Sequence, residues 1–411
     1  MQINKRKGKC KSDKFQFVVD DTMTKLIDIT GKALSGEWGS DDETGDGIPV
    51  LRTTNFTNEG VVNYNDVVTR IITKKNIDNK FLRKGDIIIE KSGGSDKFPV
   101  GRVIYFNGDE NTYLFNNFTG LLRVKNQEQW FPKYVFYSLF ANYKRGGTRI
   151  YENKTTGLHN LKTDDYVSRY EVVDMNKKQQ VLICEKLDKL CEIIKLRKKE
   201  LQLLDDLIKA RFVEMFGDPV SNSCGLPEAT LPELGEFGRG VSKHRPRNDP
   251  KLLDGEYPLI QTGDVANADL YILTYNSTYS ELGLKQSKMW KKGTLCITIA
   301  ANIAKTAILN FDACFPDSVV GFEANNRTNN IFIHYWFSFF QEILETQAPE
   351  SAQKNINLKV LSELKVIVPG KKEQDKFTDF VNQVNKSKVA VQKSLDETQL
   401  LFDSLMQKYF G

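Results

Sequence analysis

The sequence has 411 residues, 40% of them hydrophobic, which is long enough for two or three domains with packed cores. Its formal net charge of +5 is carried by the basic stretch from Lys5 to Lys14, so the rest is balanced and bulk charge does not indicate a nucleic-acid partner. Six cysteines without a CxxC pair, no signal peptide and no apolar stretch of membrane-spanning length indicate a reduced, cytoplasmic protein.

Residues 15–176 form the first segment, in which we expect short strands to outnumber helices. The runs that read as strands are Ile48–Leu51, Ile71–Ile72, Ile87–Ile89 and Val100–Phe106, with the Gly-rich loop Ser92–Ser95 between the last two. An aromatic, helix-like stretch follows at Tyr134–Phe140, then a basic loop at 144–149 and a polar turn at 154–160.

Residues 177–217 are predicted to form one long helix. Its apolar residues recur at alternating steps of four and three, and they are Ile183, Leu187, Leu190, Ile194, Leu201, Leu204, Ile208 and Met215. Such spacing is typical of a coiled-coil seam, here interrupted only by Arg197 and Arg211. These arginines either fix the register of the pair or extend to solvent. Gly217 and Pro219 give the expected stop signal.

Residues 218–370 repeat the order of the first segment at an offset of roughly 200 residues. Tyr257–Ile260 matches Ile48–Leu51, and Trp336–Phe340 matches Phe136–Phe140. Trp290–Leu295 likewise matches the turn and strand at 82–87. Several matches in the same order predict an internal duplication.

Residues 371–411 align without a gap with residues 177–217, and their seam residues are Phe377, Val381, Val384, Val391, Leu395, Phe402, Leu405 and Tyr409. Two such helices in one chain favour a paired coiled coil over two unrelated core helices. The predicted fold is therefore α+β, with two β-rich α/β domains separated by an antiparallel coiled coil in a pseudo-two-fold (domain, helix) repeat. The predicted parts are domain 1 (1–176), the central helix (177–217), domain 2 (218–370) and the C-terminal helix (371–411).

Catalytic motifs are missing from the sequence. It has no phosphate-binding GxxxxGK[ST] loop and no HExxH, and its three histidines lie far apart. Asp86 and Glu90 resemble a metal-nuclease strand, but the second copy has Thr294 and Thr298 at these positions. An ordinary turn entering a strand is the better interpretation, so we expect no catalytic residue and no metal site.

The loops of both copies are rich in side chains that read base edges or hold phosphates. In the first copy the candidate DNA-binding residues are Thr53, Asn55, Lys91, Ser92, Gly93, Gly94, Lys97, Arg145, Arg149, Lys154 and Thr155. In the second they are Lys243, Arg245, Arg247, Gln261, Thr262, Asn302, Lys305, Gln353 and Lys354. Surface loops are polar in any protein, so the argument depends on both copies placing such residues at the same points. The basic N-terminal tail is either a solvated terminus or a further polyanion contact.

Three stretches resemble the specificity (S) subunits of type I restriction-modification systems: Leu204–Pro219, Pro258–Val265 and Leu400–Phe410. With the duplicated plan, the resemblance covers nearly the whole chain. It implies two target-recognition domains that each bind one half of a split double-stranded DNA target. Leu51–Phe56 departs from the usual Ile-Gln-Thr-Gly-Asp-Val form that stands at Ile260–Val265 in the second copy.

The resemblance also implies that the helices bind two methyltransferase (M) subunits, which restriction (R) subunits join. The residues expected at this partner interface are Leu187, Leu190, Ile194, Leu201, Leu204, Val381, Val384, Leu395 and Phe402. S-adenosylmethionine, ATP and magnesium would then be bound by the partners, leaving this chain without cofactor, catalysis or membrane contact. The main alternative is a non-enzymatic coiled-coil scaffold whose loops bind proteins, and neighbouring methyltransferase and nuclease genes would discriminate the two.

Overall fold

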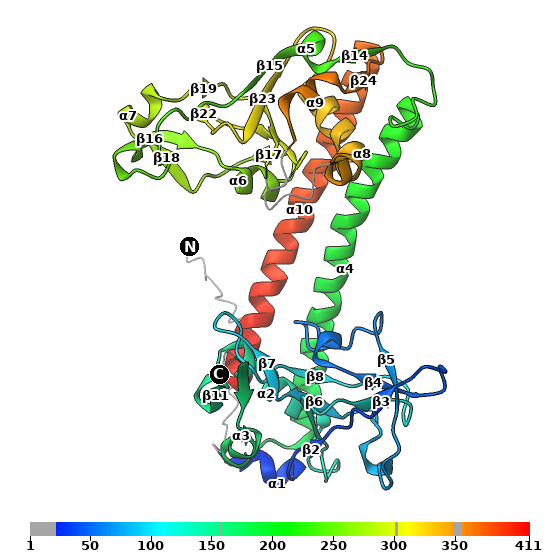
Figure 1. Cartoon of the computed structure of the whole chain (residues 1–411). Coiled ribbons are helices and arrows are strands. Elements are labelled where there is room, and N and C mark those ends of the chain that lie inside the picture. The colour runs from blue at the N-terminus through cyan, green and yellow to red at the C-terminus, as the bar shows by residue number, and fades with distance from the viewer. Residues whose placement is uncertain (1–21, 156–157, 301–302, 348–355) are drawn as a thin grey trace, which may run out of the picture. The chain divides into compact units, whose positions relative to one another are not determined.

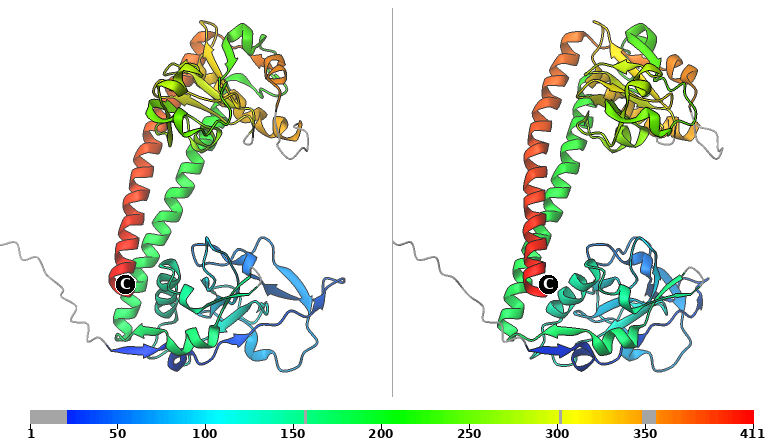
Figure 2. Two further views of the ribbon diagram at one scale, coloured as in Figure 1. Left: turned by 60° about the vertical axis from the view of Figure 1, so that its left-hand side comes forward. Right: turned by 90° about the vertical axis from the view of Figure 1, so that its left-hand side faces the viewer.

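A computed structural model describes residues 22–155, 158–300, 303–347 and 356–411 (Figure 1). The chain divides into two compact units, one made of residues 1–196 and 395–411 and the other of residues 197–394. Each of the two long helices, α4 (Lys177–Phe216) and α10 (Lys371–Phe410), therefore contributes to both units. Within each unit the two helices lie side by side in every view (Figure 2).

The first unit contains three β-sheets and a two-stranded ladder. The ladder pairs β1 (Met23–Lys25) with β13 (Glu171–Val173). One antiparallel sheet has the order β2 (Leu34–Ser35), β10 (Thr119–Leu122), β6 (Ile87–Glu90), β8 (Val103–Tyr105). A second has the order β3 (Ser40–Asp41), β5 (Val68–Ile71), β4 (Ile48–Leu51), β9 (Leu114–Phe115), with β4 and β9 parallel. The third has the order β11 (Glu152–Thr155), β12 (Leu158–Leu161), β7 (Ser92–Gly94).

The helices of this unit are α1 (Leu26–Thr30), α2 (Pro132–Lys144), α3 (Thr163–Arg169) and three 3₁₀ turns, η1 (Thr53–Asn55), η2 (Asp78–Lys80) and η3 (Arg149–Tyr151). The strand β6 is buried on both faces, which explains its unbroken isoleucine run. Helix α2 packs on β8 of the antiparallel sheet and contacts both long helices on its other side. Its Tyr137 hydroxyl donates to Asp188 of α4 at 2.6 Å, and its Tyr134 ring lies 5.1 Å from that of Phe410 of α10.

In its described residues the second unit repeats the ladder and the two larger sheets of the first, without a counterpart of the β11–β12–β7 sheet. Its ladder pairs β14 (Glu228–Thr230) with β24 (Lys365–Ile367). The larger sheet has the order β15 (Gly235–Arg239), β23 (Val319–Ala324), β20 (Leu295–Thr298), β21 (Thr306–Leu309), β17 (Tyr271–Ile272). The smaller has the order β18 (Ser277–Tyr279), β16 (Leu253–Leu259), β22 (Ala313–Cys314), β19 (Met289–Trp290). Its helices are α5 (Leu231–Leu234), α6 (Thr262–Asn267), α7 (Glu281–Lys285), α8 (Asn330–Gln347), α9 (Leu358–Glu363) and the turn η4 (Pro250–Leu252).

An aromatic cluster joins both long helices to the second domain. Phe212 and Phe216 of α4 are fully buried, and their rings lie 5.3 and 5.7 Å from that of Phe377 in α10. Phe332 of α8 stacks on Phe212 at 5.2 Å. The end of α4 thus meets the start of α10, which confirms the predicted antiparallel pairing within this unit. Burial of several large rings makes this cluster a main source of its stability.

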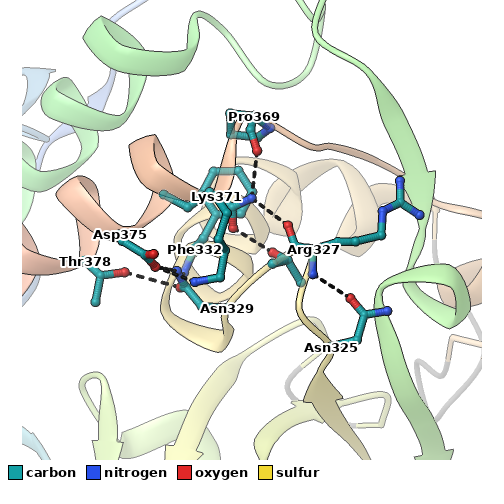
Figure 3. Close-up of polar contacts among 10 residues, drawn as sticks. Asn325, Arg327, Asn329, Phe332, Pro369, Lys371, Asp375 and Thr378 are labelled. Atoms are coloured by element: carbon teal, nitrogen blue, oxygen red, sulfur yellow. Dashed lines mark hydrogen bonds and ion pairs between the residues drawn. The ribbon is translucent and has the colours of Figure 1, made fainter.

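Equivalent glutamines attach the start of each long helix to the domain before it. Gln374 is fully buried, donates to the Pro369 and Arg327 carbonyls at 2.9 and 3.0 Å, and accepts from the Thr328 hydroxyl at 3.0 Å. Figure 3 shows the surrounding contacts, in which Asn329 of the loop before α8 also reaches Asp375 and Thr378 of α10. A buried amide with every polar atom bonded holds a helix start in one position.

The same arrangement recurs at Gln180 of α4. Its amide donates to the Gln129 and Met175 carbonyls at 3.1 and 2.7 Å and accepts from the Phe131 backbone N–H at 2.7 Å. Gln180 and Gln374 occupy the same position of the repeated helices, so the duplication includes the junction as well as the seam.

The charges that interrupt the predicted seam differ in their surroundings. Arg197 and Arg211 form ion pairs at 2.6 and 2.7 Å with Glu200 and Glu214, the acids one turn further on α4. Both side chains are partly exposed and pair with acids of their own helix. Lys388 of α10 is different, because it is buried between two carboxylates.

Candidate nucleic-acid interface

The strand β4 in the first domain and β16 in the second lead into the same type of turn. Asn55 Oδ1 accepts a hydrogen bond from the Arg52 backbone N–H at 2.8 Å, and Asp264 Oδ2 accepts one from the Gln261 backbone N–H at 2.8 Å. Each is a capping box, in which the third residue of a short helix satisfies the N-cap backbone. The two copies thus share the capping hydrogen bond, which starts a 3₁₀ turn in the first domain and the α-helix α6 in the second.

The side chains of this turn divide into buried and accessible ones. Asn55, a predicted base contact, is buried, and its amide donates to the Asn63 and Asp66 carbonyls at 3.0 and 2.9 Å. All of its hydrogen-bonding groups therefore have partners in its own domain. Thr53 is partly buried, whereas Gln261 is exposed and Thr262 is half-buried at the start of α6. Arg52, in the same donor-rich loop, occupies the position of Gln261 and pairs with the exposed Asp66 at 2.8 Å.

The Gly-rich stretch of the first domain is an edge strand rather than a free loop. Ser92, Gly93 and Gly94 form β7, which pairs with β12, and β12 pairs with β11. The backbone at Lys154 and Thr155 therefore belongs to the same three-stranded sheet as the glycines. Gly94 lies so close to the Val100 backbone that a Cβ would approach its nitrogen to 2.5 Å, which explains the need for glycine there.

The basic residues of the first domain fall into two environments. Arg149 Nη2 donates to the Asp96 and Lys97 carbonyls at 3.1 and 3.3 Å, so Arg149 and Lys97 are brought together. Arg145 is exposed at the end of α2, four residues before Arg149. Lys91 is instead partly buried, donates to the Ser35 hydroxyl at 3.1 Å, and has its pKa lowered by burial.

In the second domain, Arg245 and Arg247 converge on one carboxylate. Their guanidinium groups lie 3.5 and 2.5 Å from the two oxygens of Asp317, and both side chains remain about half exposed. Lys243 is exposed in the same loop. Lys305 is partly buried and pairs through its backbone with Thr298 in the β20–β21 hairpin. Asn302, Gln353 and Lys354 lie outside the described residues.

The acids considered as nuclease ligands both face arginine. Arg123 binds Asp86 in a bidentate manner at 2.7 and 2.6 Å, and the Arg83 backbone N–H donates to Asp86 as well. Arg102 lies 3.3 Å from Glu90, and burial raises the pKa of the Glu90 carboxyl. Among the described residues no group of three His, Cys, Asp or Glu is placed to hold a metal ion. Nor does any helix in those parts of the chain have the length and apolarity to cross a membrane.

The predicted partner-binding residues lie mostly inside the chain. The buried ones are Leu187, Ile194, Val381, Val384, Leu395 and Phe402, while Leu190, Leu201 and Leu204 are partly buried. A second apolar stripe on α4, one residue before the seam positions, remains 41–56% exposed and consists of Ile193, Leu196, Leu203 and Leu207. This stripe was not predicted from the sequence, because the seam residues alone explain the helical spacing of the apolar residues.

Two α/β domains of one plan, each holding a capped turn after its Pro-containing strand and each followed by a 40-residue helix, define a duplicated recognition protein with paired helices. The family model for the type I restriction modification DNA specificity domain matches residues 21–205 and 228–398, and the chain belongs to this family.

Solved structures agree in fold. An S subunit of a type I restriction-modification system from M. genitalium is 17% identical with a TM-score of 0.56, covering 97% of this chain and 98% of that one. A chain from work on complex assembly and conformational transition of the type I R-M system is 15% identical with a TM-score of 0.56, covering 95% and 97%.

The protein is thus a DNA specificity subunit with two target-recognition domains, and it is a non-catalytic component of its system. This confirms the family, the α+β fold and the absence of an enzymatic role that the sequence analysis predicted. The limits of the four parts and the individual DNA-binding and partner-binding residues remain predictions.

Proposed function

We propose that each recognition domain binds one half of a split double-stranded DNA target, and that the turns at Arg52–Asn55 and Gln261–Asp264 present side chains to the base edges. Arginine reads guanine and glutamine reads adenine by paired hydrogen bonds, so the two turns would favour different bases. Lys97, Arg145 and Arg149 in the first domain would hold phosphates. The loop 243–247 would do so in the second.

The observation that carries this proposal is the shared capping box. The groups that shape the turn, Asn55 and Asp264, have backbone partners in both copies. The residues that vary between the copies, Arg52 and Gln261, carry the donors and acceptors. A protein that recognises two different half-sites needs the same capped turn in both domains with different side chains facing the bases.

We further propose that the paired helices bind two methyltransferase subunits and that restriction subunits join this core in the cytoplasm. The exposed stripe of Ile193, Leu196, Leu203 and Leu207 on α4 supports the proposal, because apolar residues aligned along a helix require a covering partner. The buried seam residues would then support the docking helices from inside. S-adenosylmethionine, ATP and magnesium would be bound by the partner subunits.

The test is to express the chain with a methyltransferase subunit of its restriction-modification system and to map methylated adenines by sequencing. Gln261→Ala should relax recognition in one half of the target, and Arg52→Ala should relax it in the other. Gln383→Ala, on an exposed face of α10, is the matched control and should leave the target unchanged. Relaxation of the same half by both turn variants, or of neither half, would contradict the proposal.

A further inference from the structure

Phe98 stands at the tip of a tight turn in the first recognition domain, with 55% of its surface exposed. The Ser95 backbone N–H donates to the Phe98 carbonyl at 2.7 Å, and the Phe98 N–H donates back to the Ser95 hydroxyl at 3.1 Å. The turn is therefore closed on itself, and it holds an aromatic ring in solvent.

Several contacts fix this turn to the segment 148–152. Arg149 donates to the Asp96 and Lys97 carbonyls, and the Val100 backbone N–H donates to Glu152 at 3.0 Å. Gly101 lies against Thr148, where an added Cβ would meet the threonine side chain at 2.8 Å. A segment held by this many contacts has little freedom to fold the ring away, so the exposure of Phe98 is a property of its ordered structure.

The segment fixed against this turn carries a second exposed apolar residue, and both segments contribute cations. Ile150, directly after Arg149 in η3, is 81% exposed. The Lys97 ammonium lies 5.3 Å from the centre of the Phe98 ring, and Arg145 is exposed nearby in the chain. The one acid of the turn, Asp96, lies 3.6 Å from the buried His159 ring, and its side chain is 88% exposed on the same surface. Two apolar side chains with cations around them complement a duplex, which has apolar base faces between two rows of phosphates.

We propose that Phe98, assisted by Ile150 of the adjoining turn η3, is a wedge that enters the stack of the DNA half-site bound by the first domain. The inference rests on the proposed function, since it requires that this domain binds DNA. Apolar side chains inserted at a base step unstack it partly and bend the duplex, and the bent duplex gains contacts with the protein. A preformed turn suits this role, because it does not have to be ordered on binding.

The chemistry favours DNA over a protein partner at this place. A stable protein interface buries about 1,200 Å² or more, whereas the wedge consists of two isolated side chains among cations. The Lys97 ammonium that lies over the ring in the free chain can move to a phosphate when a base covers the ring. The wedge also reads sequence indirectly, because pyrimidine–purine steps unstack most easily.

The experiment uses the full chain purified with its methyltransferase subunit and a duplex carrying the mapped target, with 2-aminopurine placed in turn at each position of the first half-site. The unaltered chain should raise the fluorescence at one base step, because the probe brightens when it is unstacked. Phe98→Ala should abolish the rise and weaken binding roughly five- to a hundredfold. Phe98→Trp should retain the rise, and Ile150→Ala should reduce it.

Phe118→Ala is the matched control, because Phe118 is an equally exposed phenylalanine (53%) of the same domain outside the fixed turn. It should change neither fluorescence nor affinity. The salt dependence should stay the same in Phe98→Ala, which removes no cation, and should fall by about one unit in Lys97→Ala.

An unchanged fluorescence profile in Phe98→Ala would overturn the wedge. So would equal losses in Phe98→Ala and Phe118→Ala, or loss of the methyltransferase subunit, which would make the patch a protein-docking surface. If the salt slope falls in Lys97→Ala while the fluorescence of Phe98→Ala is normal, the wedge alone fails. If Lys97→Ala leaves the slope unchanged and Arg52→Ala leaves the methylated target unchanged, DNA binding by this domain fails as well.

Discussion

Lys388 Nζ lies 2.6 Å from Asp205 Oδ1, and this ion pair joins α10 to α4 within the second unit. Asp269, in the domain between α6 and β17, approaches the same ammonium at 2.5 Å. Only 10% of the Lys388 side chain is exposed, so one cation holds both helices and the recognition domain. The equivalent position of α4 is Ile194, which means that the arrangement belongs to one repeat alone.

Lys388→Met should destabilise the chain by about 1–2 kcal/mol in urea unfolding. Loss of one partner from a buried ion pair can cost about 3–5 kcal/mol, but the side chains of Asp205 and Asp269 are 45% and 67% exposed and can be rehydrated. Burial lowers the pKa of Lys388, yet hydrogen bonds and charges of the two carboxylates outweigh it and raise the pKa above 10.5.

A raised pKa means that the stabilisation is fully present below pH 10.5 and is lost only as the pH rises through the folded value. The difference between Lys388→Met and the unaltered chain should therefore be constant from pH 6 to 9. Lys386→Met, on the exposed side of the same helix, should cost less than about 0.5 kcal/mol. Equal effects of the two variants would show that Lys388 contributes no more than a surface lysine.

Gln374→Glu should destabilise the second unit by about 2–4 kcal/mol. The substitution keeps the shape but directs a carboxylate oxygen at the Pro369 and Arg327 carbonyls, so two buried acceptors lose their donor. Gln180→Glu should have a similar effect in the first unit. Gln383→Glu is the exposed control on α10. Thermal unfolding measures all three, and a tolerated Gln374→Glu would mean that water replaces the amide.

The duplication and the long helices could be predicted because they depend on local spacing. The role of the two glutamines at the helix starts could also have been predicted, since Gln180 and Gln374 are identical residues at one position of an ungapped repeat. The contacts of Lys388 could not be predicted, because Asp269 is 119 residues away and meets it only through the packing of the domain on the helix. Sequence shows which charge interrupts a seam, but the tertiary structure decides whether it finds a partner.

In the candidate site, too, some features could be predicted from the sequence and others could not. Asn55 was predicted to read bases because loop asparagines often do, and Arg52-Thr-Thr-Asn55 lacks the Ser/Thr and Glu/Gln of the usual capping-box sequence, so its capping role became visible only in the structure. Two residue pairs at equivalent buried positions of the two domains differ in both members. Asp86 binds Arg123 in one copy, while the Thr294 hydroxyl donates to Glu323 at 2.8 Å in the other. Such a paired difference cannot be recognised in a single sequence, because the two members of each pair are far apart along the chain.

His334 should make the second unit sensitive to acid. Burial lowers its pKa to about 4, an effect that the Asp269 charge opposes and the Lys388 charge reinforces. A histidine held neutral contributes stability that is complete above its unfolded pKa of about 6.5 and is lost as the pH falls toward 4. The side chain is partly accessible, so we expect a loss of about 1–2 kcal/mol rather than the full linkage value.

His334→Gln should remove this part of the acid sensitivity between pH 6.5 and 4, measured as the urea midpoint at each pH. Glutamine can still bond the Thr306 hydroxyl, which lies 2.9 Å from His334 Nδ1. His244→Gln replaces an exposed histidine 3.1 Å from Asp249 and should change the pH profile much less than His334→Gln. If His334→Gln retains the profile of the unaltered chain, other groups cause the acid sensitivity.

Asp317→Asn should strengthen binding of unrelated duplex DNA by about two- to tenfold. Arg245 and Arg247 both pair with this carboxylate, so phosphates must compete with it for the two guanidinium groups. Exposed ion pairs are worth up to about 1 kcal/mol each, and their removal leaves both cations available for phosphate. Fluorescence anisotropy at fixed salt measures the change.

Asp312→Asn is the control for net charge, because Asp312 binds Lys291 at 2.9 Å and lies outside the loop 243–247. It should strengthen binding much less than Asp317→Asn. In a second arm, Arg247→Ala should reduce the salt slope by about one unit, since one phosphate contact is lost. Equal affinities in the two asparagine variants together with an unchanged slope in Arg247→Ala would show that the loop 243–247 faces away from DNA, and the phosphate contacts of the second domain would have to be sought on another surface.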